Sequence, residues 1–220
     1  INVKVTATDG SNTTASSTFT LAVANVNDAP TEAHALLNQS AIEDAAFSYA
    51  FAADSFNDVD VGDPLTYAAT LSDGTALPTW LTFTPGTRTF NGTPANGDVG
   101  TLSIRVTATD GASATASSTF TLAVANVNDA PTVAHALPDQ NAIEDAAFSY
   151  AFAADSFNDV DVGDSLTYSA TLADGTLLPT WLSFAPGTRT FSGTPTNEDV
   201  GSINVKVTAT DGSNTTASST

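Results

Sequence analysis

The sequence contains no cysteine and no long apolar run, and these absences remove two ways of holding or anchoring a protein. Without Cys, neither a disulfide nor a thiolate metal site can stabilise the fold. No apolar stretch approaches the roughly 18 residues of a membrane-spanning helix, so we expect no direct membrane insertion. No signal peptide begins at Ile1, so an export or anchoring signal would belong to a longer parent chain.

Basic residues are also scarce. The formal net charge is −19, because 24 acidic residues stand against five basic ones, which are Lys4, Arg88, Arg105, Arg189 and Lys206. Such a chain repels polyanions, so nucleic acid is excluded as a partner. Cations are the partners that this charge favours.

Catalytic constellations are missing as well. There is no Cys nucleophile, and neither His34 nor His135 stands beside a Ser and an acid in a pattern typical of a hydrolase. The stretch GTRTF at 86–90 lacks the glycine pattern and the Lys of a phosphate-binding loop. We therefore expect a protein that is not an enzyme.

What is present is a strand pattern. Hydrophobic residues make up 41% of the chain and recur in short alternating runs between turns rich in Gly, Pro, Asn and Asp. In the first full copy, the runs at 46–52, 64–71, 79–85, 88–94, 102–111 and 118–127, with a first strand after the linker, give about seven strands. This pattern predicts an all-β protein of tandem immunoglobulin-like or cadherin-like Greek-key β-sandwiches.

An internal repeat sets the domain organisation. The hexapeptide NVNDAP occurs at 25–30 and at 126–131, and the stretch that begins at Asn27 returns at Asn128, 101 residues later. Residues 1–18 return identically at 203–220. We expect the last strands of a preceding repeat and a linker at 1–27, a complete repeat at 28–128, and at 129–220 a second repeat that lacks its last strand.

Acidic residues gather at one end of each predicted sandwich. With strands alternating up and down, the loop DVDVGD and the end of the TATDG strand meet the incoming linker, and Gly62 and Gly163 supply tight bends. Carboxylates packed together repel one another, and oxygen ligands without sulfur suit Ca²⁺ before Mg²⁺. The ligands predicted at the first repeat are Asn27, Asp28, Asp58, Asp60, Asp63 and Asp110.

A calcium joint is predicted where the two repeats meet. The opposite pole of the first repeat carries acids in the turn IED and in the loop before 102–111, and these would face the second repeat across the linker. Pro131 restricts the linker even without a metal. The alternative is that all these acids are solvated loop residues. The predicted ligands are Glu43, Asp44, Asp98, Asn126, Asn128, Asp129, Asp159, Asp161, Asp164 and Asp211.

Taken together, NVNDAP, ED, DVDVGD, TATDG and LPTWLTFTPGTRTFNGTP resemble the bacterial cadherin-like repeats of the dystroglycan-type or immunoglobulin-like class, over essentially the whole chain. The resemblance implies Ca²⁺ between successive domains, bound by Glu43, by the linker, by Asp159 with Asp161, and by Asp211. The linker has Asn126 where the cadherin motif has Asp, and it lacks the Asn that would follow Asp129, so weaker binding or fewer ions are expected. Such repeats occur in large secreted or surface proteins.

Three functions remain open from the sequence. The first is a calcium-stiffened, non-enzymatic structural repeat of an extracellular adhesin or surface fibre, whose partners are neighbouring repeats or further copies of itself. The second is a carbohydrate-binding module that meets a polysaccharide through Trp80, Tyr67 or Tyr168, although Trp80 and Trp181 within LPTWL are more typical of a core. The third is a filament subunit that exchanges β-strands; the simpler interpretation of the incomplete repeats is a window cut from a longer array.

Overall fold

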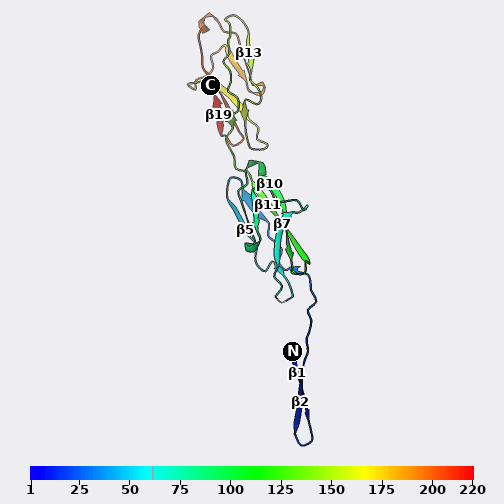
Figure 1. Cartoon of the computed structure of the whole chain (residues 1–220). Coiled ribbons are helices and arrows are strands. Elements are labelled where there is room, and N and C mark those ends of the chain that lie inside the picture. The colour runs from blue at the N-terminus through cyan, green and yellow to red at the C-terminus, as the bar shows by residue number, and fades with distance from the viewer. Residues whose placement is uncertain (61) are drawn as a thin grey trace. The chain divides into compact units, whose positions relative to one another are not determined.

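The computed structural model describes residues 1–60 and 62–220 (Figure 1). Val61, in the predicted acidic loop of the first repeat, lies outside the described residues. Among those described, strands and short 3₁₀ turns are present and α-helices are not, so the prediction of an all-β chain of tandem sandwiches is confirmed. No helix in this described part is long and apolar enough to cross a membrane.

The first 20 residues contain a two-stranded hairpin. Strand β1 (Asn2–Thr8) pairs antiparallel with β2 (Thr14–Thr20), and Asn2 lies opposite Thr20. The carboxylate of Asp9 accepts the N–H groups of Ser11 and Thr13 at 3.0 and 2.8 Å, which fixes the turn. Every side chain of β2 is exposed.

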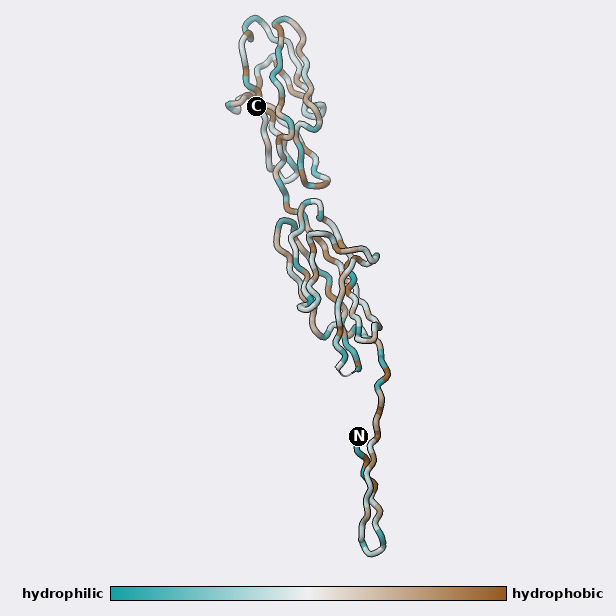
Figure 2. The backbone as a smooth tube through the Cα atoms, viewed as in Figure 1, coloured by the Kyte–Doolittle hydropathy of each residue, from teal (hydrophilic) through white to brown (hydrophobic). Residues whose placement is uncertain are grey.

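The first repeat has two main sheets and a short ladder. The sheets have the orders β4-β11-β10-β7 and β5-β9-β8, and β3 pairs with β6. Side chains of β11 alternate between buried and exposed positions from Ser118 onward, as expected for a strand with one face in a core. Figure 2 shows hydrophilic and hydrophobic residues interspersed along the backbone. The elements are β3 (Thr31–Glu32), β4 (Gln39–Ile42), β5 (Phe47–Ala50), β6 (Phe56–Asn57), β7 (Thr66–Leu71), β8 (Leu81–Thr84), η1 (Pro85–Thr87), β9 (Thr89–Gly92), η2 (Asn96–Asp98), β10 (Gly100–Thr109) and β11 (Thr115–Ala125).

The second repeat has a similar but smaller set of strands. Its sheets have the orders β13-β17-β16 and β15-β18-β19, and β12 pairs with β14. Among its described residues no strand corresponds to β4, and the strand equivalent to β11 ends at Ser219. The elements are β12 (Thr132–Val133), β13 (Phe148–Ala151), β14 (Phe157–Asn158), β15 (Thr167–Leu172), β16 (Leu182–Ala185), η3 (Pro186–Thr188), β17 (Thr190–Gly193), η4 (Asn197–Asp199), β18 (Val205–Thr210) and β19 (Thr216–Ser219).

The aromatic residues proposed for sugar binding take part in the packing. Tyr67 makes an edge contact with Phe51, with ring centroids 5.5 Å apart, and Tyr168 does the same with Phe152 at 5.4 Å. Trp80 and its equivalent Trp181 are half-buried, where the sequence predicted core residues. A polysaccharide platform would therefore have to use rings that are already engaged or half-covered.

The chain divides into two compact units, and the division does not fall at the linker. One unit contains residues 1–39, 48–92 and 102–122. The other contains residues 40–47, 93–101 and 123–220. The second unit thus holds the turn with Glu43, the loop with Asp98, the linker and the whole second repeat. The joint predicted from the sequence lies within this one unit.

Candidate metal centre

The backbone of the linker is held by two buried carboxylates. Glu43 is 1% exposed, and its Oε1 accepts the N–H of Val127 at 2.6 Å. Two residues further along, the N–H of Asp129 donates to Oδ2 of Asp161 at 2.8 Å. These two N–H groups lie at most about 7 Å apart, because a chain advances no more than about 3.6 Å per residue. The linker therefore brings the Glu43 and Asp161 carboxylates onto one short stretch of backbone.

Asn128 connects the linker to the strand end at Asp211. Its Nδ2 donates to Oδ2 of Asp211 at 3.0 Å and to the carbonyl of Asp129 at 2.9 Å. The Thr215 hydroxyl also donates to Asp211, and together with the Asn128 amide it holds the pKa of Asp211 below its usual value. Asp211 is therefore charged at neutral pH.

Three carboxylates then converge next to the linker. Asp159, Asp164 and Asp211 each place an oxygen within 4.8 Å of the others. The DVDVGD loop permits this because Gly163 has φ of 102°, a left-handed conformation that favours glycine. Like charges at this separation repel, so a bound cation would stabilise the arrangement.

Three carboxylates near the linker have a buried oxygen atom without a hydrogen-bond partner. Oε2 of Glu43, Oδ2 of Asp159 and Oδ1 of Asp161 are buried and accept no hydrogen bond from the described residues. A buried carboxylate oxygen is normally paired, because leaving it unpaired is unfavourable. Oxygens that are orphaned in this way fit a hard cation with oxygen ligands.

The remaining predicted ligands of the joint are placed differently. Asp44 has φ of 57° and its N–H donates to the carbonyl of Pro94 at 2.8 Å. Asp98 uses Oδ2 to accept the N–H of Ala95 at 3.0 Å, which closes the turn η2. The side chain of Asn126 is exposed. Asp44 and Asp98 are not among the three carboxylates that converge, and the assignment of Asp44, Asp98 and Asn126 to the joint stays a prediction.

Two residues of the joint escaped the sequence analysis. Asn96 donates from Nδ2 to Oδ2 of Asp129 at 2.5 Å, and Thr215 bonds Asp211 as described. The signal for Asn96 was its repetition as Asn197 at the same place in the second copy. The sequence around an Asn that binds a carboxylate does not differ from that around an Asn exposed to solvent in a polar loop, whereas closely spaced acidic residues indicate a cation site.

The end of the first repeat at which its chain enters reproduces part of this arrangement. Asn27 donates to Oδ2 of Asp110 at 3.0 Å, and this bond is the main reason why the pKa of Asp110 is lowered. The N–H of Asp28 donates to Asp60 at 2.8 Å. Asp58 accepts the N–H of Asp60 at 2.9 Å, and Asp63 accepts that of Gly111, also at 2.9 Å. Among the described residues, no glutamate bonds Val26 as Glu43 bonds Val127.

Solved structures with a similar fold include cadherin ectodomains. Mouse cadherin-23 EC22–24 aligns with 99% of this chain and 71% of its own, at 18% identity and a TM-score of 0.65. Protocadherin gamma B7 extracellular cadherin domains 1–4 align with 100% of this chain at 19% identity and a TM-score of 0.61. An endo-fucoidan hydrolase of glycoside hydrolase family 107 aligns at 21% identity and a TM-score of only 0.40. This chain spans 56% of the protocadherin and 33% of the hydrolase.

A family model agrees with this fold. No curated protein sequence matches the chain. The model described as "Putative Ig domain" matches residues 29–125 and again residues 130–220, and so covers most of the chain in two copies. With the cadherin-like strand arrangement, this double match makes the chain a tandem array of cadherin-like, immunoglobulin-like repeats, and it belongs to the Putative Ig domain family.

Proposed function

We propose that this chain is a calcium-stiffened, non-enzymatic structural repeat of an extracellular adhesin or surface fibre. The observation that carries the proposal is the set of buried, unpartnered carboxylate oxygens on Glu43, Asp159 and Asp161 around the linker 126–131 between β11 and β12. Solubility alone does not explain acids that are buried, because a charge that serves solubility is exposed.

Glu43, Asp129, Asp159, Asp161, Asp164 and Asp211 are the residues that would hold Ca²⁺. Bound there, the cation would neutralise their mutual repulsion and supply the contacts that their free oxygens lack. Asn128 and Asn96 act differently, since their amides donate hydrogen bonds to Asp211 and Asp129 and orient those carboxylates. Glu43, Asp159 and Asp161 each use one oxygen to accept a backbone N–H, and the second oxygen has no partner among the described residues and is free for the metal. Both oxygens of Asp211 already accept hydrogen bonds within the protein.

A bound cation would stiffen the linker because its ligands come from different segments of the chain. Glu43 comes from the first repeat, Asp129 from the linker, and the other four from loops of the second repeat. A cation shared among these segments would restrain the linker beyond what Pro131 imposes. The ligands predicted at the first repeat would hold a second cation in the same way.

The extracellular location rests on the fold and on composition. The cadherins with similar folds are described by their extracellular domains, and an acidic chain without Cys suits a medium where Ca²⁺ rather than disulfides gives rigidity. Neighbouring repeats and further copies of the same protein are the partners that a fibre requires.

Calorimetric titration of Ca²⁺ into chelator-stripped protein tests the proposal, with Mg²⁺ as a control and thermal melting in parallel. We expect saturable heat with Ca²⁺ and a higher melting temperature. X-ray scattering should give a larger maximum dimension with Ca²⁺ than with chelator. Absence of both heat and a melting shift would leave only the interpretation that the acids are solvated loop residues.

A further inference from the structure

The chain contains two Asn-Gly pairs, and they lie in different local structures. Asn91-Gly92 belongs to strand β9, whereas Asn96-Gly97 opens the 3₁₀ turn η2. Glycine has no side chain to shield its backbone N–H, so this nitrogen can attack the side-chain amide of the asparagine before it. An Asn-Gly pair is therefore a place where an amide can convert to a carboxylate, provided that the local backbone can rotate.

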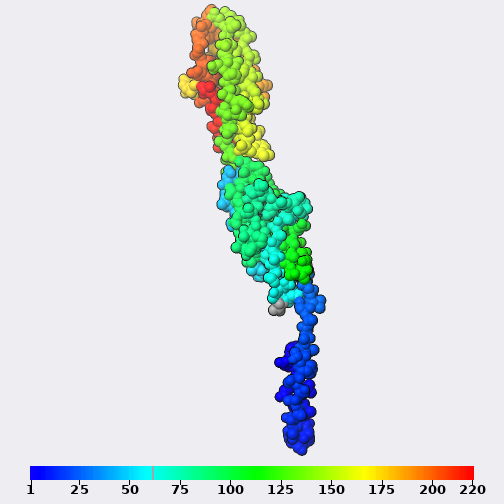
Figure 3. Space-filling view, viewed as in Figure 1, coloured from blue at the N-terminus to red at the C-terminus, as the bar shows by residue number. Residues whose placement is uncertain are grey.

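The backbone around Gly97 leaves room for this attack. Gly97 is exposed, and a Cβ built on it would meet no atom within 4 Å. Its N–H donates to no acceptor among the described residues. The turn is closed mainly by two hydrogen bonds between Ala95 and Asp98, of 2.7 and 3.0 Å. The segment around η2, which has the green of residue 100 on the colour bar, lies at the surface in the space-filling view (Figure 3). Only one short and exposed turn has to open before the nitrogen can attack.

The pair Asn91-Gly92 is held more tightly. Strand β9 is the central strand of the sheet β5-β9-β8, and Asn91 lies opposite Thr82, whose hydroxyl donates to its carbonyl at 3.0 Å. A Cβ built on Gly92 would lie 2.0 Å from the carbonyl oxygen of Trp80, so another backbone segment packs closely there. The backbone bond between an asparagine and the next nitrogen has to rotate before the two groups can react, and a central strand resists this rotation. Asn91 is therefore a control within the same molecule.

The side-chain amide of Asn96 has a defined contact in the joint. Its Nδ2 donates to Oδ2 of Asp129 at 2.5 Å. Conversion of the amide would replace this donor by a carboxylate oxygen, and two carboxylates at such a distance repel each other. A hydrogen bond that holds Asp129 in place would thus become a pair of like charges, which a cation can bridge.

We propose that Asn96 is a site of spontaneous deamidation, and that the carboxylate formed there becomes an additional charged ligand of the joint. The backbone nitrogen of Gly97 attacks Cγ of Asn96 and gives up its proton to water. The bond from Cγ to Nδ2 breaks, and ammonia leaves a five-membered succinimide. Water then adds to either carbonyl of this ring, which gives an aspartate or an isoaspartyl link at position 96. Water is the only co-reactant, and no oxidation takes place.

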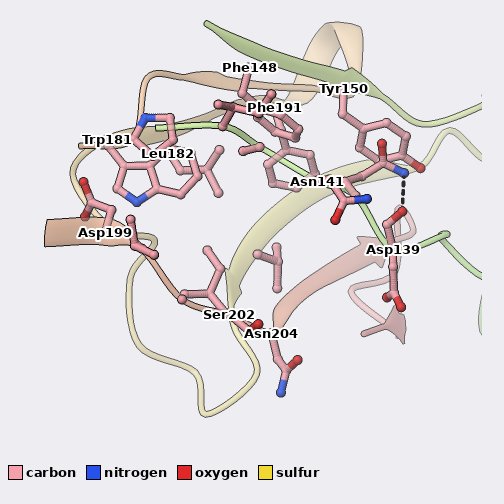
Figure 4. A pocket seen from close by; sticks show the side chains of 18 of the residues that line it. Asp139, Asn141, Phe148, Tyr150, Trp181, Leu182, Phe191, Asp199, Ser202 and Asn204 are labelled. Carbon is pink, nitrogen blue, oxygen red and sulfur yellow. Dashed lines mark hydrogen bonds between the residues drawn. The ribbon is translucent and has the colours of Figure 1, made fainter. Parts of the chain in front are cut away.

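The second repeat does not contain this pair. Its turn η4 has Asn197 followed by Glu198, whose side chain crowds the nitrogen that would attack. In other respects the two turns agree, since Asp199, labelled in Figure 4, accepts the N–H of Thr196 at 2.8 Å as its counterpart does in η2. The reaction is therefore specific to the turn that contacts the linker.

The product changes the joint in opposite directions with and without calcium. Without a cation, the new carboxylate faces that of Asp129 and destabilises the fold. With Ca²⁺ it offers another charged oxygen beside Asp129, and a higher ligand charge favours binding of this hard cation. This effect on calcium rests on the proposed function, whereas the deamidation itself does not. An older molecule would therefore depend more strongly on calcium than a freshly made one.

Peptide mapping by mass spectrometry tests the modification site. The parent protein is incubated in chelator at mildly alkaline pH, and conversion is followed at Asn91, Asn96 and Asn197 in the same sample. We expect aspartate and isoaspartate at position 96 well before any conversion at the other two positions. Gly97→Ala, for which the structure has open space, should suppress this conversion because the new methyl group hinders the attacking nitrogen. An Asn96 that stays intact, conversion of Asn91 at an equal rate, or an unchanged rate in Gly97→Ala would each overturn the proposal.

Calorimetry of a variant that mimics the product tests the role as a ligand. Asn96→Asp should lower the melting temperature in chelator and lower the dissociation constant for Ca²⁺ several-fold. Asn91→Asp adds the same charge at an exposed position of β9 and should leave that constant unchanged. If Asn96→Asp binds Ca²⁺ no more tightly than Asn91→Asp, the role as a ligand is wrong. If neither the parent nor Asn96→Asp binds Ca²⁺ while Asn96 still converts, the calcium joint is wrong and the modification site stands.

Discussion

Substitution of Glu43 by Gln tests the calcium joint most sharply, because its effect on stability should reverse sign with calcium. Glu43 is buried, one of its oxygens accepts the Val127 N–H, and the other has no partner among the described residues. Gln keeps a carbonyl acceptor for Val127 and removes the charge. Without metal, the change relieves an unpaired buried carboxylate, which is unfavourable by several kcal/mol when isolated.

In calcium the same substitution removes a charged ligand. A tenfold loss of affinity reduces the stabilisation by the metal by about 1.4 kcal/mol. For a domain of this size class, this lowers the melting temperature by about 6 to 11 °C. In chelator we expect the melting temperature of the variant to equal or exceed that of the parent. Differential scanning calorimetry of both proteins in both conditions measures the crossover.

Glu144→Gln is the matched control. Glu144 stands at the same position of the second repeat and has an exposed side chain. Its substitution should leave the melting temperature in calcium and in chelator within the scatter of replicates. The reasoning fails if Glu43→Gln shifts the melting temperature equally in the two conditions, because its role would then be structural and not tied to a cation.

Two other predictions concern the apo protein and the core. Asn128→Ala removes a hydrogen-bond donor that lowers the pKa of Asp211. A lowered pKa in the folded state stabilises the fold above the unfolded-state pKa near 4, and this stabilisation is lost as the pH falls through the folded-state pKa. Urea unfolding in chelator should therefore show a larger loss of stability at pH 7 than at pH 2, and an equal loss would refute the assignment. Gly92→Ala and Gly193→Ala should each destabilise by about 1 to 3 kcal/mol, because the new Cβ would lie 2.0 Å from the Trp80 carbonyl oxygen or 1.7 Å from that of Trp181. Gly86→Ala, with no atom within 4 Å, is the control, and an equal effect there would contradict the steric explanation.

Much of the fold was predictable because it depends on local pattern. The alternation in STFTLAVA predicts one buried face, and β11 has it. The gathering of acidic residues where the chain enters each repeat was also predictable, because a loop between strands must emerge at a sheet end. The hydrogen bonds from Asn27 to Asp110 and from Asn128 to Asp211 join the segments that were expected to meet. Asp98 was assigned to the joint because its loop stands at the pole that faces the second repeat; its Oδ2 closes a turn, and its role as a ligand stays a prediction.

The all-β class, the 101-residue repeat and the placement of acids at the strand ends follow from the amino-acid sequence alone, because strand periodicity and repetition are properties of the chain. Tertiary structure decided which acids are buried and which oxygens lack a partner, because burial depends on neighbours distant in the sequence. An apolar side chain is buried only where other segments supply a groove for it.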